Sequence, residues 1–242
     1  MKLFWIMKIK TNEKMLYDEI TSNKILTITA IFITTVIFTI AYTNGLKGSN
    51  YFKFINEIFV SVPYCSLITI ISGLLINLII FRSFLGNNLL EQRFKSKKGL
   101  FNYILKFYLK ILFIVLGFII FTIIIFSNFF SQFNLVFIID GNINENIIFI
   151  FINLYLTLIN ITIWFLISYV ILKLINDKIG IIIVVFIALY QYVSPTLFNI
   201  NIMFPYVNTY NKLWILLLTP IVVFILYKLS MIIYIKQNWK IR

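Results

Sequence analysis

Six long apolar stretches constrain this chain more than any other feature of its sequence. A helix needs roughly 20 apolar residues to cross the hydrocarbon layer, and only helices or closed barrels satisfy every backbone polar group there. The stretches are continuous rather than alternating, which favours helices over strands. The sequence therefore predicts an all-α, polytopic membrane protein whose residues 25–242 form a six-helix transmembrane domain. The predicted spans lie near 25–43, 59–81, 111–130, 147–171, 179–195 and 213–235.

Composition supports a membrane environment. Hydrophobic residues make up 61% of the 242 residues and charged residues only 12%. A soluble domain of this length has no means of hiding so much apolar surface. The net charge of +13 lies in short segments between the apolar stretches, which is typical of topology signals rather than of a nucleic-acid surface. We therefore expect the lipid bilayer, and no nucleic acid, as a partner.

Connections rich in Lys and Arg alternate along the chain with connections that contain few basic residues. Cytoplasmic loops of membrane proteins carry the excess of basic residues. Six spans with both termini on the cytoplasmic side of a cell membrane fit the alternation, whereas five or seven spans do not. Most of the 21 Lys and Arg residues fall in segments 1–24, 82–110, 172–178 and 228–242, and the other connections carry only Lys47, Lys53 and Lys212.

Residues 1–24 mix apolar side chains with lysines and acids ahead of the first span. A helix in this segment would place Leu3, Phe4 and Leu16 in the inner interface and its lysines near anionic headgroups. We predict a cytoplasmic amphipathic helix at 1–24, and a frayed basic tail is the alternative. The first apolar run is too short for a secretion signal.

The connection 82–110 is the longest on the predicted inner side. Its Gly86-Asn87-Asn88 sequence indicates a turn. A short helix after that turn would be able to dock into a groove of a cytoplasmic partner. A solvated basic loop that only sets topology is the alternative. The candidate docking residues are Leu90, Glu91, Arg93 and Phe94.

The outer connection 196–212 is rich in Asn and aromatic residues and contains Phe204-Pro205-Tyr206. Aromatic residues are common at the membrane interface. An ordinary loop and a re-entrant segment that caps the helices both fit this composition.

Two predicted spans carry a small and polar face. Small residues let helices approach closely, and amides hydrogen-bond across such contacts. We interpret both faces as helix packing within the chain, and a cargo path or a subunit interface is the alternative. The second span carries Ser66, Thr69, Gly73 and Asn77 at positions i, i+3, i+7 and i+11. The fourth span carries Asn153, Thr157, Asn160 and Trp164 at i, i+4, i+7 and i+11.

Several function classes are excluded or disfavoured. The chain has no histidine, which excludes zinc hydrolases built on His motifs and serine proteases with a His base. No acidic or basic residue lies at the middle of a span, which argues against an ion-driven transporter. A phosphate loop of the form GxxxxGK[ST] is also missing. We therefore expect no enzyme, no catalytic residue, no metal and no cofactor in this chain.

Two local sequences accompany this layout of spans. One is YDEITSNKILTI at 17–28, and the other is Glu91 followed by basic residues and then Lys106 or Lys110. With the layout, they resemble the permease subunits of type-2 ATP-binding-cassette exporters. The nearest resemblance is to small permeases for bacteriocin or lantibiotic export or self-immunity in low-GC Gram-positive bacteria. The Gly-Thr pair that often follows the Glu in that family is missing, and the loop is shorter.

The resemblance implies a function and a set of partners. It implies an exporter permease for an amphipathic or antimicrobial peptide, energised by a separate cytoplasmic ATPase that binds ATP and Mg²⁺. It also implies a second permease copy or a sister permease, and contact between the ATPase and the 82–110 connection. A stand-alone immunity or sensor protein without transport activity is the alternative. An ATPase that co-purifies with the chain would distinguish the two.

Overall fold

The computed structural model describes most of the apolar part of the chain. Within the described residues the structure is all-helical, with six α-helices and one short π-helix, which confirms the all-α part of the prediction. The described residues are 24–45, 55–56, 58–59, 61, 63–85, 97–130, 143–175, 177–193 and 214–237. The elements are α2 (Lys24–Gly45), η1 (Tyr64–Ile68), α4 (Thr69–Leu85), α6 (Lys97–Phe130), α7 (Ile143–Leu174), α8 (Asp177–Val193) and α9 (Trp214–Gln237).

Each α-helix overlaps one predicted apolar stretch. Three helical segments are long and apolar enough to cross a membrane, namely Lys98–Phe129, Ile150–Leu174 and Leu218–Lys236. Shorter apolar helices cover Thr27–Tyr42, Tyr64–Ile80 and Lys178–Val193. The predicted amphipathic helix before residue 24 and the outer connection 196–212 lie outside the described residues.

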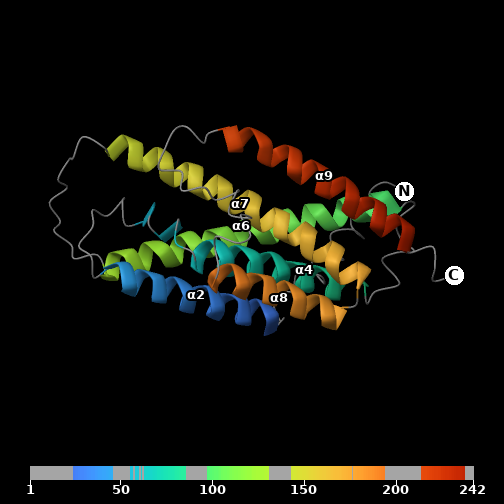
Figure 1. Ribbon diagram of the computed structural model, residues 1–242, viewed down its shortest axis with the longest axis horizontal. Coiled ribbons are helices and arrows are strands. Elements are labelled where there is room, and N and C mark those ends of the chain that lie inside the picture. Colours follow the sequence, from blue (N-terminus) through green and yellow to red (C-terminus); the bar gives the residue numbers. More distant parts are fainter. Residues whose placement is uncertain are drawn as a thin grey trace, which may run out of the picture.

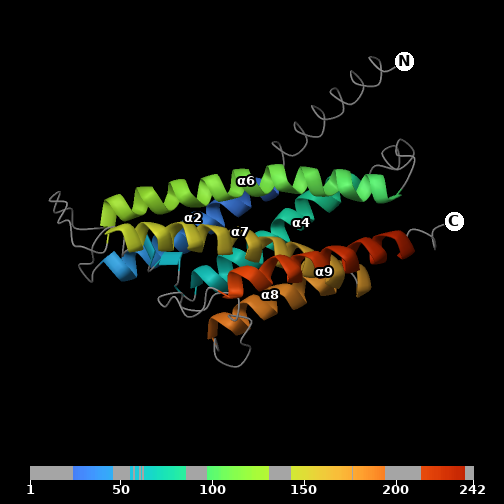
Figure 2. The same cartoon turned by 90° about the horizontal axis from the view of Figure 1, so that it is seen from above.

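Successive helices run in alternating directions (Figure 1). Helices α2, α6 and α8 run one way, and α4, α7 and α9 run the other. Turned by 90°, the bundle shows α4 and α7 between α2 and α6 on one side and α8 and α9 on the other (Figure 2). Helices α4 and α7 form the most extensive pair contact of the bundle. The two helices with predicted polar faces therefore occupy its centre.

Helix α6 is longer than the span predicted from hydropathy. It begins at Lys97 rather than near residue 111 and has 34 residues, which makes it about 51 Å long. Its first turns bury Phe101 and Ile104 while Lys106 is exposed. The ring of Phe101 lies 5.4 Å from that of Tyr234 on α9. The predicted connection 82–110 is therefore shorter than expected, because an amphipathic helical extension anchored on α9 takes up its second half.

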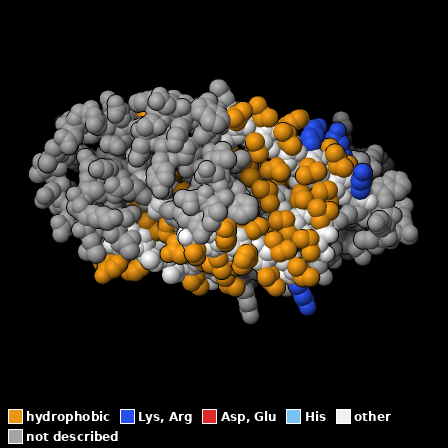
Figure 3. Space-filling view, viewed as in Figure 1, with side chains coloured by type: hydrophobic (Ala, Val, Ile, Leu, Met, Phe, Trp, Pro, Cys, Tyr) orange, Lys and Arg blue, Asp and Glu red, His pale blue; other side chains and the backbone are white. Residues whose placement is uncertain are grey.

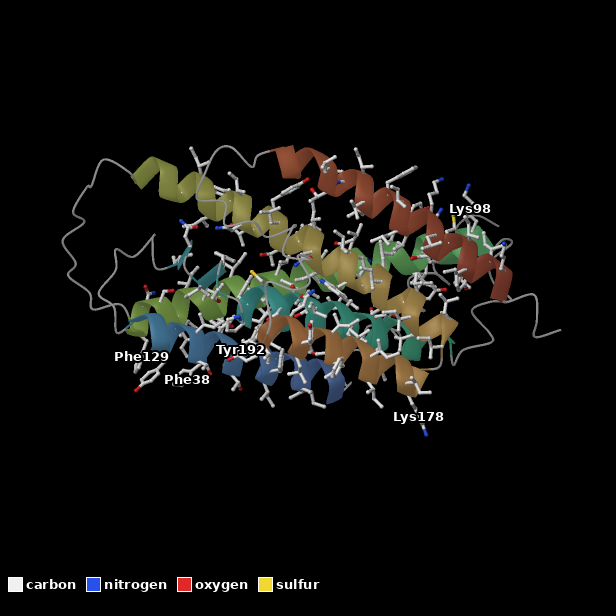
Figure 4. All side chains as sticks on the ribbon, in the orientation of Figure 1. Phe38, Lys98, Phe129, Lys178 and Tyr192 are labelled. Carbon is white, nitrogen blue, oxygen red and sulfur yellow. The ribbon has the colours of Figure 1, made fainter. Side chains whose placement is uncertain are left out.

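Lysines gather at one end of the bundle. Figure 3 shows the Lys and Arg side chains of the described residues at the end where α6 begins, and Figure 4 labels Lys98 and Lys178 there. Lys173 and Lys236 lie in the last turns of α7 and α9, which end at the same side. The last turns of α2, α6 and α8, at the opposite end, contain no basic residue. The charge alternation along the sequence thus becomes a charge difference between the two ends.

The outer surface between the two ends is apolar. Exposed side chains include Ile31 on α2, Phe113 on α6, Phe186 on α8 and Phe224 on α9, each at least 58% exposed. Soluble monomers rarely expose apolar patches that extend over several elements. Hydrocarbon is the solvent in which such a surface is stable, and the described bundle is therefore compatible with a membrane protein.

Candidate functional site

The polar faces of α4 and α7 lie against each other at the centre of the bundle. Thr69 pairs with Asn160 and Asn77 pairs with Ser168, and both pairs are separated by 91 positions along the chain. An unchanging separation means that the two helices run parallel and in register. We call this contact the polar seam. Its hydrogen-bonding side chains are Asn56, Tyr64, Thr69, Asn77, Asn153, Thr157, Asn160 and Ser168.

The middle of the polar seam is a short chain of donors and acceptors. Asn160 Nδ2 donates to Thr69 Oγ1 at 3.0 Å. Thr69 Oγ1 in turn donates to the carbonyl oxygen of Cys65 in the π-helix η1. All three residues are buried. The Thr69 hydroxyl therefore links α7 to the π-helical turn that precedes α4.

We call the end of the bundle where the lysines gather the lysine end. At the part of the polar seam nearer to it, the side-chain amide of Asn77 donates to two groups of α7. Asn77 Nδ2 donates to Ser168 Oγ at 2.9 Å and to the carbonyl oxygen of Phe165 at 3.3 Å. Ser168 Oγ donates to the same carbonyl at 3.0 Å. Asn77 and Ser168 are fully buried. This group acts as a hydrogen-bonded clamp between α4 and α7.

Gly73 lies between these two groups, at a close approach of α4 and α7. A Cβ atom at this position would be 2.8 Å from the backbone nitrogen of Phe165 and 2.8 Å from Cβ of Trp164. Neither contact is with the end of a flexible side chain. Glycine is therefore required by the space between the helices, as in other small-residue contacts of membrane helices.

The opposite end of the polar seam extends to residues ahead of α4. Thr157 Oγ1 donates its one proton to the carbonyl oxygen of Asn153 at 2.8 Å. The Tyr64 hydroxyl, 3.2 Å from Thr157 Oγ1, must therefore be the donor of that hydrogen bond. Asn153 Nδ2 donates to Asn56 Oδ1 at 3.1 Å. Ser66 is buried within the π-helix.

Three residues of the polar seam were missed by the sequence reasoning. Ser168 continues the spacing of the α7 face at position i+15 from Asn153, so the pattern contained it. Tyr64 follows Pro63 directly and does not belong to the small-residue pattern of α4. Asn56 precedes the predicted second span, and no periodic signal marks it.

The polar seam offers hydrogen bonds but no charge. Oδ1 of Asn77, Oδ1 of Asn160 and Oγ of Ser72 are buried without a hydrogen-bond partner among the described residues. The described residues also contain no group of three His, Cys, Asp or Glu side chains placed to hold a metal ion. The polar seam therefore suits helix association or recognition of polar groups, and it has no acid or base for proton transfer.

The candidate docking residues Leu90, Glu91, Arg93 and Phe94 lie outside the described residues. The helices on either side of them are described. Helix α4 ends at Leu85 and α6 begins at Lys97, and both positions lie at the lysine end of the bundle.

Comparison of the chain with protein-family models, with curated proteins and with solved structures finds no match.

The first prediction concerns the middle of the polar seam. Asn160→Leu removes the hydrogen bond to Thr69, and we expect it to lower the free energy of unfolding by about 1 kcal/mol. Thermal unfolding in detergent measures this change. Thr35→Leu is the matched control, because Thr35 is exposed and its hydroxyl donates to the carbonyl oxygen of Ile31 in the same helix. A variant that keeps its melting temperature but loses peptide resistance in cells would instead show that Asn160 contacts cargo.

Proposed function

We propose that this chain is the membrane-spanning permease subunit of an ATP-binding-cassette exporter, with six spans and both termini in the cytoplasm. The observation that carries the proposal is the location of the connection between α4 and α6. Helix α4 ends at Leu85 and α6 begins at Lys97, both at the lysine end of the bundle, and the basic residues there favour a cytoplasmic location for this end. An ATPase bound to that connection would act directly on the two helices.

The long α6 supports a mechanical role for this connection. The helix runs without a break from Lys97 to Phe130, so a push at its cytoplasmic end is carried to the opposite end of the bundle. Tyr108 on α6 donates to Thr162 on α7 at 2.8 Å, and its ring stacks on that of Phe165 at 4.0 Å. Movement of α6 would therefore move α7, and with it the polar seam.

The proposed energy source is ATP hydrolysis on a separate subunit. This chain has no phosphate loop and no ionisable side chain at the middle of the predicted spans to couple transport to an ion gradient. A nucleotide-driven closure of two ATPase subunits would shift two permease copies, or this chain and a sister permease, between inward- and outward-open states. The proposed cargo is an amphipathic or antimicrobial peptide, for export or self-immunity.

A stand-alone immunity or sensor protein is the second candidate function. One feature of the polar seam favours this second function. The side chains of the polar seam hydrogen-bond to each other across α4 and α7, so they do not line an open path inside one chain. A path for peptides would then have to form between two copies rather than inside one. A protein that only binds a toxin requires no such path and no ATPase.

The second prediction tests the ATPase contact. Glu91→Lys, and separately the double change of Leu90 and Phe94 to alanine, should each reduce recovery of a phosphate-loop ATPase about tenfold, as expected for central interface residues. The measurement is pull-down of the ATPase with tagged permease, while membrane insertion stays normal. Lys178→Gln, in the first turn of α8 at the lysine end, is the control and should retain the ATPase. Undiminished recovery of the ATPase with both variants would exclude this contact. If no ATPase is recovered with the unchanged chain, the stand-alone immunity or sensor protein is favoured.

A further inference from the structure

A groove of about 430 Å³ opens between α6, α7 and α9. This volume lies within the range of about 300–1,000 Å³ that is usual for small-molecule sites. Leu109, Tyr155 and Phe224 line it and are partly exposed at 47%, 39% and 58%. The groove is therefore open to the surroundings of the bundle and not sealed in its core.

The contacts around the groove hold its walls in place. Tyr227 donates to Asn102 Oδ1 at 3.0 Å and so ties α9 to the cytoplasmic extension of α6. Tyr108 stacks on Phe165, and its hydroxyl donates to Thr162. Because these hydroxyl groups have partners in the protein, the groove presents mainly hydrocarbon and aromatic surface. Such a surface is suited to an acyl chain.

A lysine ammonium lies at the edge of this groove. Lys228 Nζ is 5.2 Å from the ring centre of Phe224 and 5.9 Å from that of Tyr227, and both rings line the groove. Cation–aromatic contacts of this length hold a lysine over the ring faces. The ammonium is thereby fixed next to the apolar surface.

Further positive charge borders the groove, and the one acidic residue of these three helices, Glu145, lies in the first turn of α7 at the opposite end of the bundle. Lys106 and Lys110 are exposed and follow the lining residues Leu105 and Leu109 directly in α6. The stretches 97–130, 146–174 and 214–237 contain no Asp or Glu. An apolar groove bordered by lysines complements a molecule with a hydrocarbon chain and a negative head.

We propose that this groove binds a phospholipid with an anionic headgroup, whose acyl chain lies along α7 and α9 and whose phosphate contacts Lys228. Basic pockets between membrane helices on the cytoplasmic side bind anionic lipid headgroups in this way. A second copy of this chain fits the site poorly, since it would bring another net charge of +13 toward the same lysines. The binding does not depend on whether the protein transports a cargo.

The test measures lipid affinity of the full chain in an uncharged detergent by native mass spectrometry. The probes are dioleoyl phosphatidylglycerol, dioleoyl phosphatidylcholine and glycerol 3-phosphate. We expect tight binding of one phosphatidylglycerol, weaker binding of phosphatidylcholine, and no binding of glycerol 3-phosphate, which lacks acyl chains. Lys228→Gln should weaken phosphatidylglycerol about fivefold, the loss expected for one basic residue near anionic lipid.

Two further variants separate headgroup from chain recognition. Leu109→Trp fills the groove and should weaken both phospholipids. Lys178→Gln removes an exposed lysine of α8 at the same end of the bundle and should change neither affinity. Equal affinities for the two phospholipids, or equal effects of Lys228→Gln and Lys178→Gln, would reduce the site to ordinary lipid contact and overturn the proposal. Binding of glycerol 3-phosphate as strong as that of the lipid would overturn it too, in favour of a free-anion site.

Discussion

Gly73→Leu is expected to cost about 3 kcal/mol or more of unfolding free energy, at or above the upper end of the usual cost of overpacking. A Cβ atom alone would be 2.8 Å from backbone nitrogen of Phe165 and 2.9 Å from the carbonyl carbon of Trp164. Backbone atoms of a packed helix cannot rotate away as the end of a side chain can. The leucine would therefore force α4 and α7 apart and break the hydrogen bonds of the polar seam on both sides.

Gly117→Leu is the matched control for this experiment. Gly117 lies in α6, and a Cβ atom placed on it meets no atom within 4 Å. The change from glycine to leucine also favours the helix by itself. We expect Gly117→Leu to keep or raise the melting temperature in detergent while Gly73→Leu lowers it strongly. Equal melting temperatures for the two variants would contradict the close packing of α4 on α7.

Asn77→Asp should cost about 3 kcal/mol, comparable to placing an aspartate at the centre of a membrane helix. The Asn77 amide nitrogen donates to Ser168 Oγ and to the carbonyl oxygen of Phe165. A carboxylate has no N–H group, so both hydrogen bonds that Asn77 donates would be lost. Its negative oxygen atoms would instead face the carbonyl oxygen of Phe165. Asn77 is also fully buried, so no water is available to solvate the new charge.

The control for Asn77→Asp is the same exchange at Asn102. That residue is exposed, and its Oδ1 accepts a hydrogen bond from the Tyr227 hydroxyl. A carboxylate accepts the same bond, so Asn102→Asp should leave the melting temperature nearly unchanged. Yield of folded protein and thermal unfolding in detergent measure both variants. A stable, well-expressed Asn77→Asp protein would mean that the polar seam is open to water.

Hydropathy predicted the helices but not all of their lengths. The apolar stretch near 111–130 is part of α6, yet the helix begins at Lys97, because lysines in the preceding residues reduce their mean hydropathy. One-sided burial of Leu100, Phe101 and Ile104 stabilises that extension through contact with other helices. Averaging over a window removes such a pattern, whereas a search for helical periodicity retains it.

The residues of the polar faces could be predicted, but the helix that each face contacts could not. Spacing placed Thr69, Gly73 and Asn77 on one side of a helix. That Gly73 lies against Trp164 depends on the relative register of α4 and α7, which no local pattern encodes. Tyr64 joins the polar seam through the π-helical turn after Pro63, a backbone feature without a periodic signal. The docking residues at 90–94 stay a prediction.

The most direct test of the account is the membrane topology of the chain. Single cysteines at Asn142, Ser96 and Lys178, in a Cys65→Ser background, would be treated with an impermeant maleimide on intact cells. Asn142 directly precedes α7, which begins at the end of the bundle without basic helix ends. Ser96 directly precedes α6 and Lys178 is in the first turn of α8, and both of these helices begin at the lysine end. We predict labelling of Asn142→Cys in intact cells, and labelling of Ser96→Cys and Lys178→Cys only after permeabilisation. The reverse pattern would contradict the orientation, and equal labelling of Asn142→Cys and Ser96→Cys would contradict a membrane crossing by α6.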